Sequence, residues 1–268
     1  MKMLVTGAAG FIGSNFVRLV LERHPSTEMV VLDALKYSGR KSTMADFLAN
    51  DRVTFVQGEI DDENTVRSLY DQHNFTHVVN FAAESHNDRS LENPYDFARS
   101  NFWGPLVLFT EARNRNIERI LQVSTDEVYG SIDEGEFTEN SPIEPNTPYS
   151  AAKAGGDLLA RAFFKTYELP VIVTHGGNTY GPFHYPEKLI PFFVTRLIDD
   201  KKVPLYGEGT QVREWIHAHD HANGILTALL NGEPGEIYNV GDDNERQNIE
   251  IVDILLDELN KDRSLIKT

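Results

Sequence analysis

The chain has 268 residues, of which 40% are hydrophobic, so it can bury a substantial core as one large domain or two interleaved ones. Its 25 basic and 41 acidic residues give a formal net charge of -16, which argues against non-specific binding to nucleic acid or to an anionic membrane. The absence of cysteine excludes a disulfide framework and a thiolate metal site. No apolar run has the length of a membrane span and the chain begins with strand-like residues, so we expect a soluble cytoplasmic protein without a signal peptide.

Short β-branched and apolar runs alternate with helical patterns along the first two thirds of the chain. The predicted strands cover residues 2–5, 29–32, 53–56, 77–81, 119–123 and 171–174. The predicted helices cover residues 12–23, 63–72, 105–115 and 149–167. Apolar strands separated by helices are typical of a parallel sheet covered on both faces, so the sequence predicts an α/β fold with a Rossmann-type doubly wound sheet.

After Thr174 this rhythm loosens. Glycine and proline residues at 176, 177, 181, 182, 186, 191, 204, 207 and 209 predict loops and short elements, followed by a helix over 248–260. We expect a Rossmann domain over residues 1–174 and a smaller substrate-binding lobe over 175–268, interleaved with the first domain and covering the C-terminal edge of its sheet.

A glycine-rich turn joins the first predicted strand to the first predicted helix. Residues 6–13 read Thr-Gly-Ala-Ala-Gly-Phe-Ile-Gly. Such glycines permit a tight turn and close backbone approach to a pyrophosphate, which the helix N-terminus favours electrostatically. The glycine pattern alone also fits an ordinary turn with tight helix packing, but its position predicts a dinucleotide site at Gly7, Gly10, Phe11, Ile12 and Gly13.

Asp33 ends the second predicted strand, 20 residues beyond Gly13. A carboxylate there can accept hydrogen bonds from an adenosine ribose and repels a 2′-phosphate. The sequence therefore predicts NAD rather than NADP, a preference that the neighbouring Lys36 and Arg40 would weaken.

Two adjacent carboxylates, Asp126 and Glu127, follow the predicted strand 119–123 in the segment Ser-Thr-Asp-Glu-Val-Tyr-Gly. Ligands of open α/β sheets lie beyond the carboxyl ends of the strands, so we expect this pair to face a reacting molecule. Mutual repulsion in a dry site keeps one carboxyl charged and the other neutral, which suits acid and base roles. The alternative is that the pair only caps the following turn.

Tyr149 and Lys153 are four residues apart in a predicted helix and therefore share one face. A tyrosine and a lysine placed in this way can remove a proton from an alcohol.

Together, the glycine turn, Asp33 and the Tyr149–Lys153 pair resemble the extended short-chain dehydrogenase/reductase superfamily. Within it, the segments 82–90, 124–130, 186–191 and 203–215 resemble the dTDP-glucose 4,6-dehydratases. Sugar-nucleotide epimerases share the tyrosine and lysine but typically lack the adjacent acid and base. GDP-mannose dehydratases and UDP-glucuronate decarboxylases usually carry Ser at the position of Asp126.

The resemblance implies a reaction in which NAD+ oxidises C4 of a hexose on a nucleoside diphosphate. Tyr149, with Lys153 favouring its phenolate, would take the 4-hydroxyl proton, and Thr125 would hydrogen-bond the same oxygen. Glu127 would remove the C5 proton while protonated Asp126 donates to the departing 6-hydroxyl. Hydride would then return to C6 and give a 4-keto-6-deoxy sugar.

The resemblance also assigns residues to the two ligands. The further cofactor-binding positions are Lys36, Glu59, Ile60, Ala82 and Ala83, beside Tyr149 and Lys153. The substrate-binding positions are Glu84, Ser85, Asn101, Asn178, Lys188, Leu189, Tyr206, Arg213 and Asn248. Among these, Asn178, Lys188 and Arg213 are expected near the diphosphate, Tyr206 on the nucleobase, and Asn101 in support from a helix.

His217, His219 and His221 alternate along a possible strand and superficially resemble a metal site. Coordination requires three or four converging ligands, so we predict no metal.

Three departures from the family pattern stand out. His175, Gly176 and Gly177 replace an Arg-Cys-Ser or Arg-Thr-Asn run, and we expect the two glycines to loosen a substrate-holding loop. Gln211 and Pro105 replace a usual Asn and Thr. Family members usually continue past the last helix with an Asp-Arg-Pro-Gly-His-Asp segment, whereas this sequence ends at Thr268; if that segment is missing, substrate affinity is expected to suffer more than NAD binding.

Alternatives remain open at this point. The first is a UDP- or CDP-glucose 4,6-dehydratase or a 4-epimerase, and the second is a non-catalytic NAD-binding protein. Helical segments at 94–115 and 149–167 resemble those that form a four-helix interface in this superfamily, so a homodimer is expected.

Overall fold

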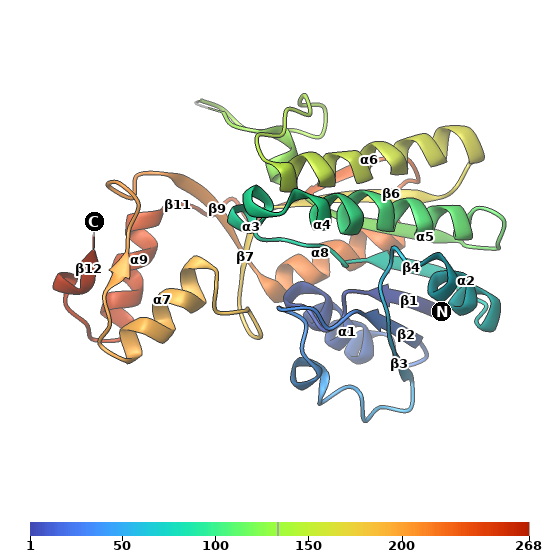
Figure 1. Cartoon of the computed structure of the whole chain (residues 1–268), viewed down its shortest axis with the longest axis horizontal. Helices are drawn as coiled ribbons and strands as arrows, with labels where there is room; N and C mark the ends of the chain where they lie inside the picture. Colours follow the sequence, from blue (N-terminus) through green and yellow to red (C-terminus); the bar gives the residue numbers. More distant parts are fainter. Residues whose placement is uncertain (133, 268) are drawn as a thin grey trace.

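A parallel sheet of seven strands forms the middle layer of the molecule (Figure 1). The computed structural model describes residues 1–132 and 134–267. The strands of this sheet are β1 (Lys2–Thr6), β2 (Glu28–Asp33), β3 (Val53–Gln57), β4 (His77–Asn80), β5 (Arg119–Thr125), β6 (Val171–Gly176) and β10 (Ile237–Val240). Their spatial order is β10, β6, β5, β4, β1, β2, β3, and all neighbours run parallel. The predicted Rossmann-type α/β fold is confirmed, and all six predicted strands are present.

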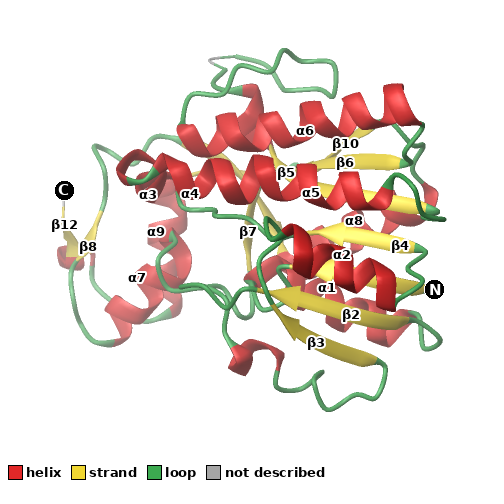
Figure 2. Cartoon of the chain, turned by 45° about the vertical axis from the view of Figure 1, so that its right-hand side comes forward, coloured by secondary structure: helices red, strands yellow, loops and turns green. Residues whose placement is uncertain are grey.

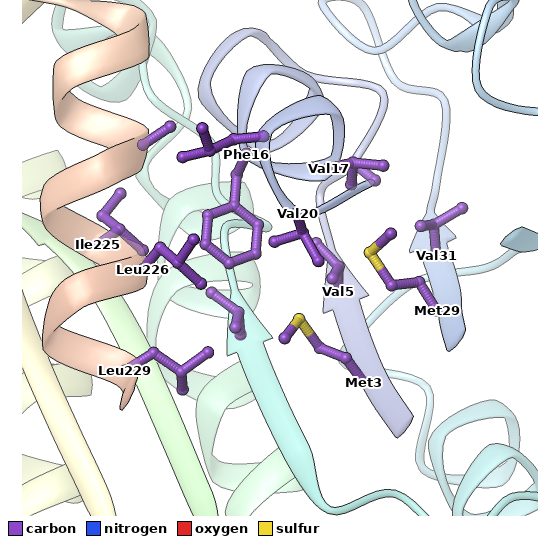
Figure 3. Packing of buried hydrophobic residues seen from close by; sticks show 14 of the residues in the cluster. Met3, Val5, Phe16, Val17, Val20, Met29, Val31, Ile225, Leu226 and Leu229 are labelled. Atoms are coloured by element: carbon purple, nitrogen blue, oxygen red, sulfur yellow. The ribbon is translucent and has the colours of Figure 1, made fainter. Parts of the chain in front are cut away.

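The two faces of the sheet bury alternate residues of each strand. Met3 and Val5 of β1 pack with helices α1 (Phe11–Arg23) and α8 (Ala218–Asn231), as Figure 3 shows around Phe16. Leu4 points to the opposite face and packs with α2 (Glu63–Gln72), α5 (Gly104–Ala112) and α6 (Pro148–Tyr167). Each large apolar side chain buried in this way contributes roughly 1.5–3 kcal/mol, which explains why strands with apolar residues on both faces lie in the middle of three layers.

A smaller lobe lies beyond the carboxyl ends of the strands (Figure 2). Helices α7 (Leu189–Ile198) and α9 (Asn248–Glu258) bury Phe193, Leu197, Val252 and Leu256 between them, next to the short pair β8 (Val203–Pro204) and β12 (Ile266–Lys267). A three-stranded sheet of β7 (Asn178–Tyr180), β9 (Val212–His217) and β11 (Glu245–Gln247) connects this lobe to the rest of the molecule (Figure 1).

The chain passes between the large sheet and the lobe more than once. After β9 it returns as α8, which packs against α1, and as β10, which pairs with β6. Residues 218–240 therefore belong to the large layer by their contacts, while 241–267 return to the lobe. The division into domains at residues 174 and 175 stays a prediction.

Several helical regions differ from the prediction, including α8. The helix predicted over 105–115 ends at Ala112 and continues a longer run of α4 (Pro94–Ala98) and a π-helical segment, η2 (Arg99–Trp103), preceded by α3 (Asn87–Glu92). The prediction that Pro191 interrupts the chain is wrong, because Pro191 lies in the first turn of α7, where a missing N–H removes no helical hydrogen bond. Single 3₁₀ turns occur at η1 (Lys41–Met44), η3 (Asp126–Tyr129) and η4 (Arg263–Leu265).

Within the described residues, no helix combines the length and apolarity that crossing a membrane requires.

Candidate active site

A cleft of about 1630 Å³ separates the carboxyl ends of the large sheet from the lobe. With one exception, every site residue predicted from the sequence lines it. On the sheet side these are Gly7, Gly10, Phe11, Ile12, Gly13, Asp33, Lys36, Glu59, Ile60, Ala82, Ala83, Glu84, Ser85, Thr125, Asp126, Glu127, Tyr149 and Lys153. On the lobe side they are Asn178, Lys188, Leu189, Tyr206, Arg213 and Asn248.

The exception is Asn101, which is buried in η2 and does not line the cleft. Its side chain accepts a hydrogen bond from the Glu84 amide (3.0 Å) and donates one to the Glu84 carbonyl (2.9 Å). Both polar ends of Asn101 are therefore used to hold the backbone that precedes Ser85. The predicted support from a helix agrees with this placement, whereas a direct substrate contact does not.

The glycine turn brings backbone close to backbone at the end of β1. Gly7 has φ +70°, and a Cβ atom there would lie 2.6 Å from the Ala82 nitrogen. A Cβ on Gly13 would collide with the Gly7 carbonyl. Only glycine fits both positions, and the turn leaves the start of α1 open to the cleft, as a pyrophosphate site requires.

Asp33 is buried at the end of β2, and each of its carboxyl oxygens accepts a backbone hydrogen bond. The donors are the amides of Ala9 (2.9 Å) and Leu35 (2.8 Å), so the side chain also fixes the glycine turn. Burial raises the pKa of Asp33, and these two bonds oppose that rise. Nearby Lys36 pairs with Glu59 (3.2 Å) and Glu84 (3.9 Å), so its charge is balanced by carboxylates beside Asp33.

The acidic pair follows β5 directly. The Thr125 hydroxyl donates to Asp126 (3.2 Å) and accepts from the Glu127 amide (3.3 Å), which makes Thr125 the cap of the turn that carries both carboxyls. Burial, and secondly the charge of Glu127, raise the pKa of Asp126 to about 6. Glu127 instead accepts a 2.7 Å hydrogen bond from the side-chain amide of Asn87. The two neighbours therefore differ in environment as acid and base roles require.

Helix α6 delivers Tyr149 and Lys153 to the same point. Thr147 begins it with a reciprocal capping box to Ser150 and a proline at the first helical position, which sets where the first turn lies. Burial, and secondly the charge of Glu127, raise the pKa of Tyr149, and the Thr125 hydroxyl partly opposes this. Burial lowers the pKa of Lys153 to about 8, and its ammonium group donates to the Val123 carbonyl (2.6 Å).

A chain of polar side chains, buried except for Asn239, lies at the same end of the sheet as the acidic pair. His175 contacts the Tyr129 hydroxyl through Nδ1 (2.7 Å) and Asp157 through Nε2 (3.2 Å). Asp157 also accepts from Ser124 (2.7 Å), and Tyr129 donates to Asn239 (2.9 Å). The chain joins β5, η3, α6, β6 and β10, and all of its members except Asp157 line the cleft.

The expected loosening at Gly176 is wrong. His175 and Gly176 belong to β6 and pair in register with Ser124 and Thr125 of β5. A Cβ on Gly176 would collide with the buried ring of His221, so the glycine permits close packing at this place. Gly177 lies just beyond the strand.

The predicted strand of alternating histidines is also wrong. Strand β9 ends at His217, which caps α8, and His219 and His221 lie inside that helix. His219 is exposed beside Asp220, while buried His221 contacts the Thr179 hydroxyl (2.7 Å). Among residues 1–132 and 134–267, no group of three or more metal-ligating side chains converges.

The lobe side of the cleft carries basic and aromatic groups on separate elements. Lys188 precedes α7 and donates to the Ser85 carbonyl (2.9 Å), and burial lowers its pKa. Arg213 lies on β9, exposed, with one hydrogen bond to the Val212 carbonyl (2.7 Å). Tyr206 is 81% exposed in the loop after β8. Asn178 begins β7 and Asn248 begins α9.

Known proteins similar to this chain over nearly its whole length include nucleotide-sugar 4,6-dehydratases. A family model described as GDP-mannose 4,6 dehydratase matches residues 4–267. A dTDP-glucose 4,6-dehydratase of an Actinoplanes species is 46% identical over 262 residues, covering 96% of this chain and 81% of that protein. The chain belongs to the dTDP-glucose 4,6-dehydratase family.

Two solved structures show how the 4,6-dehydratase family relates to its neighbours. The dTDP-glucose 4,6-dehydratase of Streptomyces venezuelae, solved with NAD and dTDP bound, is 47% identical with a TM-score of 0.96, covering 100% of this chain and 84% of that one. A UDP-glucose 4-epimerase of Thermus thermophilus, solved with NAD, is 30% identical with a TM-score of 0.89, covering 98% and 84%. The fold is therefore shared with epimerases, and the sequence is closer to the 4,6-dehydratase.

Three residues at the site, Asn87, Tyr129 and Asp157, were not predicted from the sequence. Asn87 contacts Glu127 although it lies 40 positions away in the chain, and Asp157 and Tyr129 hold His175. Asn87 and Tyr129 lie inside the segments that carry the resemblance, and Asp157 lies four residues after Lys153 on the same face of α6. That helical spacing was the available signal for Asp157.

Proposed function

We propose that this protein dehydrates a nucleoside-diphosphate glucose, with dTDP-glucose as the expected substrate, to the 4-keto-6-deoxy sugar by an NAD-dependent reaction. The observation that carries the proposal is the pairing of two unlike carboxyls at the end of β5. Asp126 has a pKa raised to about 6, and Glu127 accepts a hydrogen bond from Asn87. An epimerase requires only oxidation and reduction at C4, so it has no use for such a pair.

The residues of the glycine turn fit NAD. The close approaches at Gly7 and Gly13 leave backbone amides and the start of α1 free to meet a pyrophosphate. The Asp33 carboxyl reaches the cleft, and Lys36 is paired with carboxylates, which supports NAD over NADP. NAD+, when bound, supplies oxidation at C4 of the sugar and reduction at C6.

The side chains of this protein then handle the protons. Tyr149 takes the proton of the 4-hydroxyl, with the Thr125 hydroxyl beside it. Because the pKa of Tyr149 is raised in the protein without cofactor, the positive charge of the bound nicotinamide is needed in addition to Lys153 to favour the phenolate. Once C4 is a ketone, the C5 proton is acidic; the Glu127 carboxylate removes it and returns it to C5 when C6 receives hydride.

Asp126 donates its proton to the departing 6-hydroxyl, so water leaves and no hydroxide is formed. A carboxyl with a pKa of about 6 is partly protonated near neutral pH, which suits a general acid. Lys188, Arg213 and Asn178 bind the diphosphate in this proposal, and Tyr206 packs on the base. In this proposal residues 1–174 bind NAD and the substrate-binding lobe comes from 175–268, apart from residues 218–240, which return to the large layer.

The proposal extends to a cytoplasmic homodimer. Apolar side chains are exposed on neighbouring helices of one face: Tyr95 on α4, Phe102 and Trp103 on η2, and Leu158 and Tyr167 on α6. These helices contact one another and form one surface (Figure 2). An apolar surface of this kind supports association with a second copy. Sedimentation should give twice the chain mass of 30.3 kDa; a monomer at micromolar concentration would contradict it.

Product analysis tests the function. The purified protein is incubated with dTDP-glucose and, separately, UDP-glucose, and the alkaline absorbance of a 4-keto-6-deoxy sugar is followed. We expect the product from dTDP-glucose at a higher kcat/KM than from UDP-glucose. A galactose nucleotide as product would favour the 4-epimerase, and NAD binding without turnover would favour a non-catalytic protein.

A further inference from the structure

Asn87 connects two parts of the site that are distant in the sequence. It is the first residue of α3, and its side chain lines the cleft. The Nδ2 atom donates to Glu127 Oε2 (2.7 Å), and Oδ1 accepts from the Thr147 hydroxyl (3.0 Å). Thr147 caps the helix that carries Tyr149. One amide therefore touches the proposed C5 base and the cap of the element that holds the proposed C4 base.

The hydrogen bonds place the NH₂ end of the Asn87 amide at Glu127 and its carbonyl end at Thr147. The Thr147 hydroxyl oxygen accepts from the Ser150 backbone N–H (3.1 Å), so its own hydrogen is available to donate to Asn87. The Thr147 oxygen also lies 2.9 Å from Ser150 Oγ, where either atom can donate, and it faces the carbonyl end of the Asn87 amide at 3.0 Å. The NH₂ end is left for Glu127, and an amide N–H can only donate.

A donor aimed at a carboxylate favours the ionised form of that carboxylate. The neighbouring Asp126 has a different set of partners. Its side-chain bond is to the Thr125 hydroxyl at 3.2 Å, longer than the 2.7 Å bond of Glu127. Burial acts on Asp126 in the opposite direction and favours its protonated form. A single residue of another element, Asn87, thus gives the two adjacent carboxyls different hydrogen-bond partners.

We propose that Asn87 is a positioning residue that holds Glu127 oriented into the cleft, so that Glu127 and not Asp126 serves as the base at C5. The inference rests on the proposed dehydration. It assigns Asn87 no contact with the reacting atoms, because its two polar ends are used by Glu127 and Thr147.

The test uses two substitutions at Asn87 and one matched control. Asn87→Asp keeps the shape and the oxygen that faces Thr147 but replaces the donor by a like charge. Asn87→Leu removes both polar ends. Asn93→Leu breaks a hydrogen bond of the same type, from an asparagine to a carboxylate (Asp96, 2.6 Å), on an exposed surface away from the cleft.

The readout separates C5 deprotonation from the other steps. With dTDP-glucose, kcat should fall about 10- to 100-fold in both Asn87 variants, more in Asn87→Asp, as expected from losing a hydrogen bond to a charged group. KM should change less than about threefold, and absorbance of reduced cofactor should accumulate because C4 oxidation continues. Substrate deuterated at C5 should give a larger primary isotope effect on kcat than in wild type, while Asn93→Leu should match wild type.

The possible outcomes are distinguishable. Wild-type kcat and isotope effect in Asn87→Asp would overturn the role of Asn87 while leaving the proposed function intact. Equal losses in C4 oxidation and C5 deprotonation would also overturn it, because they indicate a general structural defect. If Asn87→Leu fails to fold, the isosteric Asn87→Asp decides alone. A wild-type protein that neither reduces its cofactor nor forms the keto sugar would overturn the proposed function, and this inference with it.

Discussion

The two walls of the cleft hold their polar groups in different ways. On the sheet wall, Asp33, Thr125 and Lys153 are buried and hydrogen-bonded within the protein. On the lobe wall, Lys188 is held by the Ser85 carbonyl, but Tyr206 is 81% exposed and the guanidinium of exposed Arg213 has one hydrogen bond to the adjacent carbonyl. Groups fixed in a low-dielectric wall can stabilise charge without rearranging, whereas exposed side chains adapt to a ligand.

We infer from this difference that the sheet wall carries the chemistry and the lobe wall recognises the substrate. We expect substitutions on the sheet wall to change rates, cofactor affinity or pH behaviour, and substitutions on the lobe wall to change substrate affinity alone. Four variants test that division, in order of decreasing expected effect.

Glu127→Gln should give the largest loss. The side chain keeps its size but can no longer remove the C5 proton, so turnover with dTDP-glucose should fall about 10²- to 10⁴-fold. Stopped-flow absorbance should show reduced cofactor persisting. The exposed Glu22→Gln serves as the control, and a Glu127→Gln enzyme with wild-type turnover would remove Glu127 from the mechanism.

Asp33→Asn should weaken cofactor binding. Both oxygens of Asp33 accept backbone N–H groups, and an asparagine must turn its NH₂ toward one of these donors. NAD affinity, measured by calorimetry on protein freed of cofactor, should fall about 10- to 100-fold. NADP should lose less, because the repelling charge is gone. Asp46→Asn, on the surface, is the control, and equal losses for both cofactors would contradict the assignment of Asp33 to the ribose.

Asp126→Asn should stabilise the protein at high pH. Because the fold raises the pKa of Asp126 from 3.8 to about 6, its favourable contribution is complete below pH 3.8 and is lost as the pH rises through 6. The variant should therefore gain about 1–2 kcal/mol in free energy of unfolding at pH 8 and much less at pH 5. Urea unfolding at both pH values measures this; a variant less stable than wild type at pH 8 would contradict it. Elimination should slow in the same variant while C4 oxidation stays measurable.

Tyr206→Ala should have the smallest effect. Loss of one stacking contact should raise KM for dTDP-glucose about three- to tenfold without changing kcat. The melting temperature should stay at the wild-type value because the side chain is exposed. A fall in kcat with unchanged KM would break the division between the two walls.

Much of the fold was predictable because its signals are local. The six predicted strands are apolar at successive positions, and that pattern is sufficient for a parallel sheet buried on both faces. Strand β10 and helix α8 were not predicted, since membership in the sheet depends on pairing with β6 and packing on α1 across long stretches of chain. The prediction at Pro191 was wrong because, in sequence, a proline in the first turn of a helix cannot be told from one that ends a helix.

The sequence by itself determined the parts of the site whose residues lie close together along the chain. The glycines of residues 7–13 fit a turn, Asp126 and Glu127 follow a strand directly, and Tyr149 and Lys153 are one helical turn apart. Such relations depend on backbone geometry within a single element, which the residue types specify.

Only the tertiary structure decided which neighbours these groups have. Asn87 reaches Glu127, and Asn101 turns both of its polar ends to Glu84, away from the cleft. His175, which in sequence stands where the family usually has an arginine, joins Asp157 and Tyr129 at the cleft. Each contact joins side chains from different elements, so it exists only after the sheet and helices have packed, and its direction depends on which hydrogen-bond partners are buried beside it.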